Sequence, residues 1–303
     1  MKTLTIIGGS GFVGKSFIDG FNRNKLKKFN IKKINIICRS PKKIKKIKSL
    51  NLKKVRLIKG DIERLRALPI SDLYIYAAET TNVALYKNAG QIIKKHKKAI
   101  NNFCKITKKQ NLNNILYLSS GIASKANKFH NSKYKKIYSK LKIYSENKIK
   151  NLSKNKVKTS IARCYTFVGC WLPKNSHYAI ENFINDGLHK KKIFVNSKSK
   201  VIRSYMYADD LIVWLTKIVI NSNINCPIYD VGSNEKIELR ELALRIGKIF
   251  NKPIVFKKYK SSKIDKYIPN INKTKKKLKL KIISKLNESI KLSIKGILNE
   301  KTN

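Results

Sequence analysis

A tyrosine and a lysine four residues apart form the pair in this sequence with the clearest capacity for proton transfer. Tyr138 and Lys142 lie in a segment of helical periodicity, and four residues are about one helical turn, so the two side chains share a face. The ammonium would favour the phenolate and lower the pKa of Tyr138, which suits a proton donor and acceptor. The same spacing occurs in two other pairs, Tyr144/Lys148 and Tyr259/Lys263. Only position in the fold can select one pair, because chance explains three in a lysine-rich chain.

A glycine-rich stretch near the N-terminus has the composition of a phosphate cradle. Residues 4–7 form a short apolar run typical of a buried strand, glycines follow, and Phe17 and Ile18 resume an apolar pattern at helical spacing. A strand, a glycine turn and a helix place free backbone N–H groups and the positive end of a helix dipole against a phosphate. Glycine is needed because the backbone must turn sharply and approach the ligand closely.

Three interpretations fit this stretch. Gly9, Gly11 and Gly14 have the spacing G-x-G-x-x-G of a dinucleotide-binding turn. Gly8, Gly11 and Gly14 have the wider spacing G-x-x-G-x-x-G, which is a variant of the same turn. The segment Gly9–Ser16 also satisfies the P-loop pattern G-x-x-x-x-G-K-S, and a tight turn without a ligand is the third interpretation.

Residues further along the chain favour the dinucleotide interpretation. A P-loop needs an acidic residue at a strand end to hold magnesium, and Asp61 is the candidate. Phe12 and Val13, which lie between the glycines of the P-loop pattern, suit packing under a helix better than binding a phosphate. A dinucleotide site needs a residue at the end of the second strand to bind the adenine ribose. Arg39 stands there without a carboxylate, so it would pair with the 2′-phosphate of NADP or be an ordinary surface arginine.

Apolar runs typical of strands alternate with lysine-rich segments of helical periodicity over the first half of the chain. The expected strands after the first are 34–38, 55–58, 73–78, 115–118 and 157–162, and the expected helices include 92–107 and 137–152. This alternation predicts an α/β fold with a Rossmann-type doubly wound parallel sheet, whose ligands bind at the carboxyl ends of the strands. After residue 169 the alternation weakens, which predicts a smaller C-terminal substrate lobe.

The charge of the chain suggests a second class of partner. Its 303 residues include 69 basic and 17 acidic side chains, for a formal net charge of +52, and such an excess is typical of nucleic-acid binders. However, only nine of the basic residues are Arg, the type that phosphate-binding surfaces favour, while Lys, Ile and Asn, which share A/T-rich codons, are abundant together. We therefore favour compositional drift and leave a nucleic-acid partner as the alternative.

Cysteine use and hydropathy indicate the compartment. The five cysteines are scattered without a C-x-x-C pair, and the four histidines form no metal-spaced pair, which favours reduced thiols and no metal site. The sequence contains no run of eighteen apolar residues and begins directly on a predicted strand, so we expect neither a membrane span nor a signal peptide. A cytoplasmic location follows as the expectation.

Short motifs occur in order along nearly the whole chain: Gly8-Gly9-Ser10-Gly11-Phe12-Val13-Gly14, Gly60-Asp61-Ile62, Ala77-Ala78, Leu118-Ser119-Ser120-Gly121, Tyr138-x-x-x-Lys142-x-x-x-Glu146, and then segments 162–169, 179–184, 203–211, 229–233 and 267–269. Each motif is weak by itself, but the ordered set resembles the extended short-chain dehydrogenase/reductase family. It is most similar to the NAD-dependent epimerase/dehydratase branch, whose members act on nucleotide sugars. Counted back from the segment around Arg163, the family's tyrosine falls on Tyr138 and not on Tyr144.

The resemblance implies roles for the matching residues. Tyr138 would exchange a proton with a sugar hydroxyl, Ser120 would hydrogen-bond the same oxygen, and Lys142 would hold the nicotinamide ribose; these three would be the catalytic residues. Asn182 and Arg203 would join Ser120 in binding the substrate, and a guanidinium suits a diphosphate. Ser120 as a strand-end cap and Asn182 as an ordinary helix residue remain the simpler alternatives. The cofactor-binding residues would be Gly8, Gly11, Phe12, Val13, Gly14, Arg39, Asp61, Ile62, Ala77, Ala78, Tyr138 and Lys142.

The sequence also departs from the pattern of this family. Gly121 and Ile122 stand where the family's dehydratases have an Asp-Glu pair, so a 4,6-dehydratase mechanism lacks its acid and base. Family members dimerise through helices near 94–109 and 137–152, both of which are lysine-rich here, so a homodimer stays open.

We therefore expect an NAD(P)-dependent epimerase or 4-ketoreductase of nucleotide sugars that serves glycan precursor synthesis. The alternatives are a 4,6-dehydratase-like enzyme, a non-catalytic nucleic-acid-binding or regulatory protein on the same fold, and a P-loop hydrolase. The expected NAD(P)-binding Rossmann domain comprises 1–165 and 201–232, and the expected substrate-binding lobe comprises 166–200 and 233–303.

Overall fold

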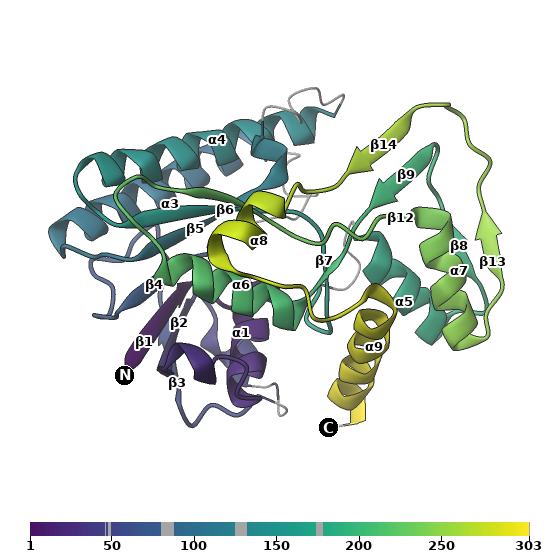
Figure 1. Ribbon diagram of the computed structural model, residues 1–303, viewed down its shortest axis with the longest axis horizontal. Coiled ribbons are helices and arrows are strands. Elements are labelled where there is room, and N and C mark those ends of the chain that lie inside the picture. Colours follow the sequence, from purple (N-terminus) through teal and green to yellow (C-terminus); the bar gives the residue numbers. More distant parts are fainter. Residues whose placement is uncertain (46, 48–49, 80–87, 125–131, 174–177, 303) are drawn as a thin grey trace.

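The computed structural model describes residues 1–45, 47, 50–79, 88–124, 132–173 and 178–302. Within these residues the central element is a parallel sheet of seven strands, in the order β11-β6-β5-β4-β1-β2-β3 (Figure 1). The strands are β1 (Lys2–Ile7), β2 (Ile31–Cys38), β3 (Val55–Lys59), β4 (Leu73–Tyr76), β5 (Ile115–Ser120), β6 (Thr159–Cys164) and β11 (Ile228–Val231). The order reverses between β1 and β4, and ligands of such sheets bind at this reversal. The predicted Rossmann-type α/β fold is therefore confirmed.

Helices cover both faces of this sheet because the strands are apolar on both sides. On one face lie α3 (Ala89–Lys109) and α4 (Lys133–Lys154), which share an apolar core with Ile7, Tyr76 and Tyr117. On the other face, α1 (Phe12–Asn22) and α6 (Ala208–Ile220) pack on Leu4, Ile6 and the remaining inner side chains, and the buried Trp214 fills this layer. The short helix α2 (Pro41–Lys45) follows β2.

A second lobe has its own apolar core. Its helices are α5 (Ala179–His189), α7 (Leu239–Phe250) and α9 (Leu286–Thr302), as Figure 1 shows. Its small sheets pair β8 (Ile193–Val195) with β13 (Ile254–Phe256), and β9 (Lys200–Arg203) with both β12 (Ile237–Glu238) and β14 (Ile264–Tyr267). The paired strands β7 (Phe167–Val168) and β10 (Met206–Tyr207) connect the lobe to the sheet.

Two short pieces of chain cross the expected domain boundaries. Strand β9 pairs within the second lobe, although residues 201–203 were expected in the cofactor domain. Helix α8 (Asn272–Leu278) contributes Leu278 to the core beneath the large sheet, and Thr274 donates a hydrogen bond to the carbonyl of Asp230 on β11. The C-terminal part of the chain thus returns to the large sheet, and the division into two domains remains a proposal.

Strand β4 ends two residues before the end of the expected apolar run. Ala77, Ala78 and Glu79 therefore lie in the loop at its carboxyl end, beside the end of β1. Among the helices described, none combines the length and the apolar composition needed to cross a bilayer.

Candidate active site

The glycine turn after β1 is packed too tightly for other residues. Gly8 has a φ of +87°, and a Cβ there would lie 2.4 Å from the Cα of Ala78. A Cβ on Gly14 would lie 2.1 Å from the carbonyl oxygen of Gly9. Gly11 is the N-cap of α1 and has no side chain to accept from the N–H groups of the first turn. This turn fits a dinucleotide diphosphate, because those N–H groups remain directed at the carboxyl edge of the sheet.

The P-loop interpretation is wrong, because its functional groups have other partners. The hydroxyl of Ser16 is buried and donates to the carbonyl of Phe12 at 2.8 Å. The ammonium of Lys15 lies 5.5 Å from the centre of the Trp171 ring. Asp61 follows β3, which is separated from β1 by β2, and its carboxylate accepts the N–H of Glu63 at 3.1 Å.

The other predicted cofactor residues line or support the same edge of the sheet. Ala77 donates its N–H to the carbonyl of Ile7 at 2.8 Å, and this bond holds the loop after β4 against β1. Ile62 is buried in the core under α3, and Arg39 is exposed directly after β2.

The side chains of Phe12 and Val13 pack into the core between α1 and α6. The Phe12 ring stacks on Phe167 with 6.1 Å between the centroids. These two residues can therefore offer a ligand mainly their backbone.

Lys142 is buried at the carboxyl end of β5, with 3% of its surface exposed. Its Nζ donates to the carbonyl of Leu118 at 2.8 Å and forms an ion pair with Glu79. The other carboxylate oxygen of Glu79 accepts a hydrogen bond from the hydroxyl of Tyr117 at 2.5 Å and lies 3.8 Å from Nε2 of His96. The lysine that sequence analysis assigned to a ribose is thus already held by a carboxylate.

Tyr138 lies one turn before Lys142, and the Lys142 ammonium is 5.5 Å from the centre of its ring. Burial raises the pKa of the Tyr138 phenol well above its ordinary value, and the nearby charge of Glu79 raises it further. The prediction that Lys142 lowers this pKa is therefore wrong for the protein in this state. The physical reason is first the burial of the phenol and second the carboxylate of Glu79, which offsets the ammonium.

Ser120 ends β5 and faces an aromatic pair from other parts of the chain. Its Oγ is 3.2 Å from the hydroxyl of Tyr267, the last residue of β14. The Tyr267 ring lies against Tyr165, with 4.6 Å between the centroids. A Cβ on Gly121 would lie 2.4 Å from the Tyr165 ring, so no larger residue fits there without moving the ring.

The two predicted diphosphate-binding residues lie on different elements of the second lobe. Arg203 is the register partner of Tyr267, which places it beside the Ser120 contact. Its guanidinium donates to both the carboxylate and the carbonyl of Asp265, at 2.8 and 2.7 Å. Asn182 is half-buried in the first turns of α5, one turn after Tyr178, which is close enough to Tyr138 to raise its pKa.

Glu146 and Arg163 fix α4 against the sheet. The guanidinium donates to both carboxylate oxygens, at 2.9 and 2.7 Å, and Ser119 donates to the same carboxylate at 2.6 Å. Because a buried bidentate pair holds both elements rigidly, it positions the helix that carries Tyr138 and Lys142.

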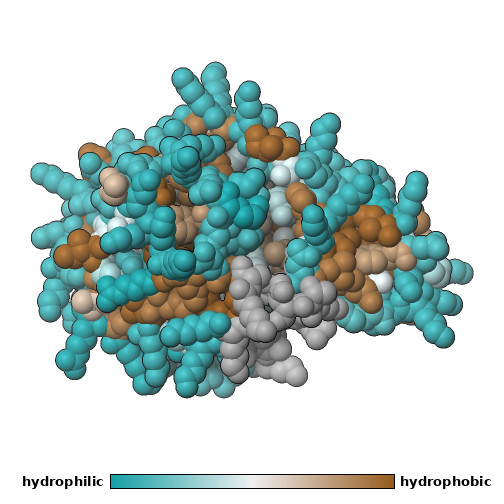
Figure 2. All heavy atoms as spheres, turned by 90° about the horizontal axis from the view of Figure 1, so that it is seen from below, coloured by the Kyte–Doolittle hydropathy of each residue, from teal (hydrophilic) through white to brown (hydrophobic). Residues whose placement is uncertain are grey.

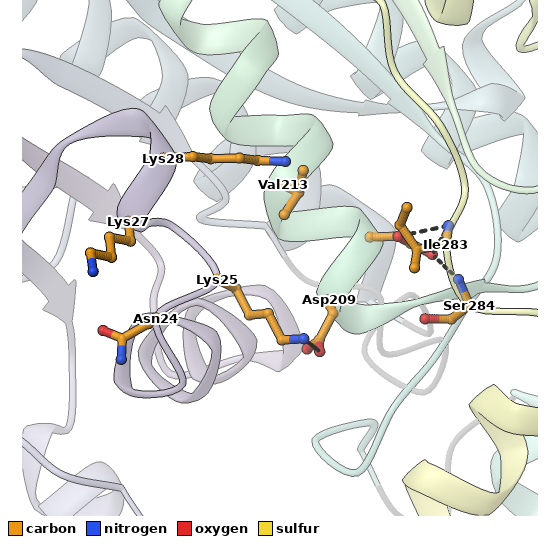
Figure 3. A pocket seen from close by; sticks show the side chains of 9 residues that line it. Asn24, Lys25, Lys27, Lys28, Asp209, Val213, Ile283 and Ser284 are labelled. Atoms are coloured by element: carbon orange, nitrogen blue, oxygen red, sulfur yellow. Dashed lines mark hydrogen bonds and ion pairs between the residues drawn. The ribbon is translucent and has the colours of Figure 1, made fainter.

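A surface cavity of about 660 Å³ between the end of α1 and the start of α6 contains none of the predicted site residues (Figure 3). Its acidic groups have structural partners: Asp209 pairs with Arg23 and Lys25, and Asp210 accepts the N–H groups of Ile283 and Ser284. Among the described residues there is no cluster of three metal-ligating side chains.

Sequence analysis missed several residues that contact the site: Glu79, His96, Tyr117, Tyr165, Tyr267 and Asp265. Glu79 carried a usable signal, because it is one of 17 acidic residues and follows the Ala77-Ala78 motif at a strand end. Tyr165 and Tyr267 lie within the motif segments 162–169 and 267–269 but were given no role, and His96, Tyr117 and Asp265 reach the site only through the fold.

A sequence profile of the NAD dependent epimerase/dehydratase family matches residues 4–232. The chain therefore belongs to this family. No match was found among curated proteins.

Solved structures with the same fold cover nearly the whole chain. UDP-glucose 4-epimerase from Thermotoga maritima has a TM-score of 0.78 at 16% identity, over 99% of this chain and 100% of that one. UDP-N-acetylglucosamine 4-epimerase from Methanobrevibacter ruminantium has a TM-score of 0.78 at 16% identity, over 99% of both chains. dTDP-glucose 4,6-dehydratase from Bacillus anthracis, solved with NAD, has a TM-score of 0.75 at 13% identity, over 100% of this chain and 98% of that one.

Proposed function

We propose that this protein is an NAD(P)-dependent oxidoreductase of nucleotide sugars that acts as an epimerase or 4-ketoreductase. The proposal rests on the position of Lys142, whose ammonium donates to the carbonyl of Leu118 near the end of β5 and lies 5.5 Å from the centre of the Tyr138 ring, and on Ser120, which ends the same strand. Membership of the family and the nucleotide-sugar ligands of the similar structures support the substrate class.

The residues divide the work by position. When bound, a nicotinamide dinucleotide supplies the acceptor or donor of a hydride. Tyr138 takes or gives the proton at the sugar oxygen, and Ser120 holds that oxygen by a hydrogen bond. Lys142 has three N–H donors, two of which face Leu118 and Glu79, so the third is the one that would hold a ribose hydroxyl.

We propose NADP as the preferred form of the cofactor. Arg39 is exposed at the end of β2, where a guanidinium suits a 2′-phosphate, and no acidic residue stands at that strand end to bind a 2′-hydroxyl. Binding of NAD and of NADP to wild type and to Arg39→Ala, measured by quenching of protein fluorescence, tests this preference.

An epimerase or reductase suits the site better than a dehydratase. Elimination of water needs an acid and a base beside the sugar, and Gly121 and Ile122 supply neither. The packing of the Tyr165 ring against Gly121 leaves no room for a longer side chain at that position.

Substitution of Tyr138 tests the proposed function. Tyr138→Phe keeps the ring packing and removes the proton donor, so we expect cofactor binding to persist and turnover to fall by roughly 10²- to 10⁴-fold. The assay is nicotinamide absorbance with a panel of nucleotide sugars.

Tyr144→Phe is the matched control on the same helix. Tyr144 also precedes a lysine by four residues, but its hydroxyl donates to Asn101 at 3.0 Å, outside the site. Full activity of Tyr138→Phe would refute the assignment, and a loss in Tyr144→Phe of equal size would show a general effect on the helix.

A further inference from the structure

Glu79 is a buried carboxylate that contacts three other elements of the fold. It follows β4, its side chain is 9% exposed, and it meets Lys142 on α4, Tyr117 on β5 and His96 on α3. A charge that is removed from water is costly unless it is paired and hydrogen-bonded, and both conditions are met here.

We propose that Glu79 is a positioning residue of the active site: its carboxylate fixes the ammonium of Lys142 beside β5 and sets the net charge that Tyr138 meets. The effect of Glu79 on catalysis rests on the proposed function, whereas the effect of Glu79 on the titration of Tyr138 does not. A purely structural ion pair would hold α4 in place without affecting the phenol.

The short distance between the Lys142 ammonium and the Tyr138 ring distinguishes a role in charge balance from a purely structural role. The Lys142 ammonium is 5.5 Å from the Tyr138 ring, so an unpaired ammonium would favour the phenolate. With Glu79 in contact, the two charges sum to zero beside Tyr138. The raised pKa of Tyr138 agrees with this balance, since burial is the main cause and Glu79 is the next.

No other ion is described beside this pair that would replace Glu79. The titratable groups beside the pair are Tyr76, His96, Tyr117 and Cys164, and those beside the Tyr138 phenol are Tyr134, Tyr178 and Tyr267. Burial lowers the pKa of His96 despite the opposing effect of Glu79, so its imidazole is neutral at pH 7. The phenols of Tyr76, Tyr117 and Tyr138 are also neutral at that pH, because burial raises the pKa of each.

A protonated Tyr138 has a direct consequence for the chemistry. A neutral phenol could donate its proton to the carbonyl oxygen of a keto sugar, with a bound reduced nicotinamide supplying the hydride to the carbonyl carbon and water returning a proton to the phenolate. Glu79 would thus keep Tyr138 in the proton-donating form that the reduction needs.

Titration of the protein without cofactor tests the charge balance directly. The phenolate absorbance of wild type and Glu79→Gln is followed against pH, each with and without Tyr138→Phe, so that the difference isolates one phenol among the tyrosines. We expect the Tyr138 phenol to titrate at least about one pH unit lower in Glu79→Gln. An unchanged titration would overturn the proposal.

A second pair of variants keeps the test valid if Glu79→Gln fails to fold. Lys142→Met leaves the carboxylate unpaired, and Glu79→Gln with Lys142→Met removes both charges, which buried pairs often tolerate. The phenol should titrate at a higher pH in the single variant than in the double variant, and equal values would overturn the proposal.

Activity provides the separate readout. In Glu79→Gln the alkaline limb of kcat against pH for keto-sugar reduction should move to lower pH, because the phenol must be protonated to donate its proton. Glu241→Gln, at a surface pair with Arg245, is the matched control with an unchanged profile. A lower kcat with an unmoved limb would indicate a structural role only. If wild type binds no nicotinamide and converts no nucleotide sugar, the proposed function fails while the titration still decides the role of Glu79.

Discussion

At the scale of single residues, the site is built from polar groups that satisfy one another before any ligand enters. Lys142 is held by Leu118 and Glu79, Ser120 lies against Tyr267, and Arg203 is held by Asp265. These partners limit the positions that the three side chains can adopt. A substrate diphosphate would have to compete with Asp265, whose side chain is 44% exposed, for the guanidinium.

The Glu79–Lys142 pair makes a pH-dependent contribution to stability. Burial alone would raise the pKa of Glu79, but Lys142, His96 and two hydrogen bonds together hold it below 4.5. A carboxyl group with a depressed folded pKa adds stability above its unfolded pKa and loses it as the pH falls through the folded value. We expect Glu79→Gln to be less stable than wild type at pH 7 by roughly 3 kcal/mol.

This difference should shrink as the pH falls below 4.5, because wild type then loses the charged pair as well. Urea unfolding of both proteins at several pH values measures it. A difference that stays constant down to acid pH would show that the charge of Glu79 does not contribute.

The hydroxyl of Tyr267 should act through Ser120. Tyr267→Phe keeps the ring against Tyr165 and removes one hydrogen bond worth roughly 1 kcal/mol, so we expect kcat to fall about fivefold with little change in KM. Steady-state kinetics with the active nucleotide sugar measure the effect. Tyr259→Phe removes a hydroxyl that binds Glu238 at 2.8 Å, and it should leave kcat unchanged. Equal effects in both variants would contradict this role for Tyr267.

At the scale of elements, the close contact between the loop after β4 and the glycine turn that joins β1 to α1 decides which residues fit in that turn. Gly8 lies under Ala78 in a left-handed conformation, so the spacing between β1 and β4 leaves no room for a side chain. The glycine at position 8 is therefore required by close packing, whether or not a ligand binds there.

Replacement of two glycines by alanine compares a tightly packed, left-handed position with an open helical one. Gly8→Ala places a Cβ 2.4 Å from the backbone of Ala78, so we expect strong destabilisation and loss of cofactor binding. Gly90→Ala, in α3 with no atom of the described residues within 4 Å of the added Cβ, should stabilise the protein by about 0.5 to 1 kcal/mol. Thermal unfolding and cofactor titration measure both, and a stable, cofactor-binding Gly8→Ala would contradict the tight packing.

At the scale of the whole molecule, the net charge of +52 must be spread over the surface. On the face seen in Figure 2, hydrophilic side chains extend on all sides and surround separate hydrophobic areas rather than gathering in one patch. The scarcity of Arg, with nine among 69 basic residues, suits compositional drift better than a nucleic-acid interface.

Self-repulsion of this charge should make stability depend on salt. We expect the midpoint of thermal unfolding to rise when sodium chloride is increased from about 0.01 M to 0.15 M, because the screening length falls from about 30 to 8 Å. Scanning fluorimetry measures the shift, with sucrose as an uncharged control. A midpoint that is unchanged or lower in salt would contradict net repulsion.

The sequence by itself determined the alternation of strands and helices, the glycine turn and the order of the motifs. These features are local, because strand and helix periodicity and turn chemistry depend on neighbouring residues. The assignment of Tyr138 rather than Tyr144 also followed from motif order, and the structure places Lys142 beside the end of β5.

Only the tertiary structure decided which charges face one another. Ser120 and Tyr267 are 147 residues apart, Glu79 and Tyr117 are 38 apart, and the C-terminal strands and α8 lie in a lysine-rich region without clear periodicity. Contacts of this kind form when the sheet and the second lobe assemble, so no local pattern encodes them. For the same reason, the pKa of Tyr138 could not be derived from its spacing to Lys142, because it depends on the burial of the phenol and on a carboxylate from the loop after β4.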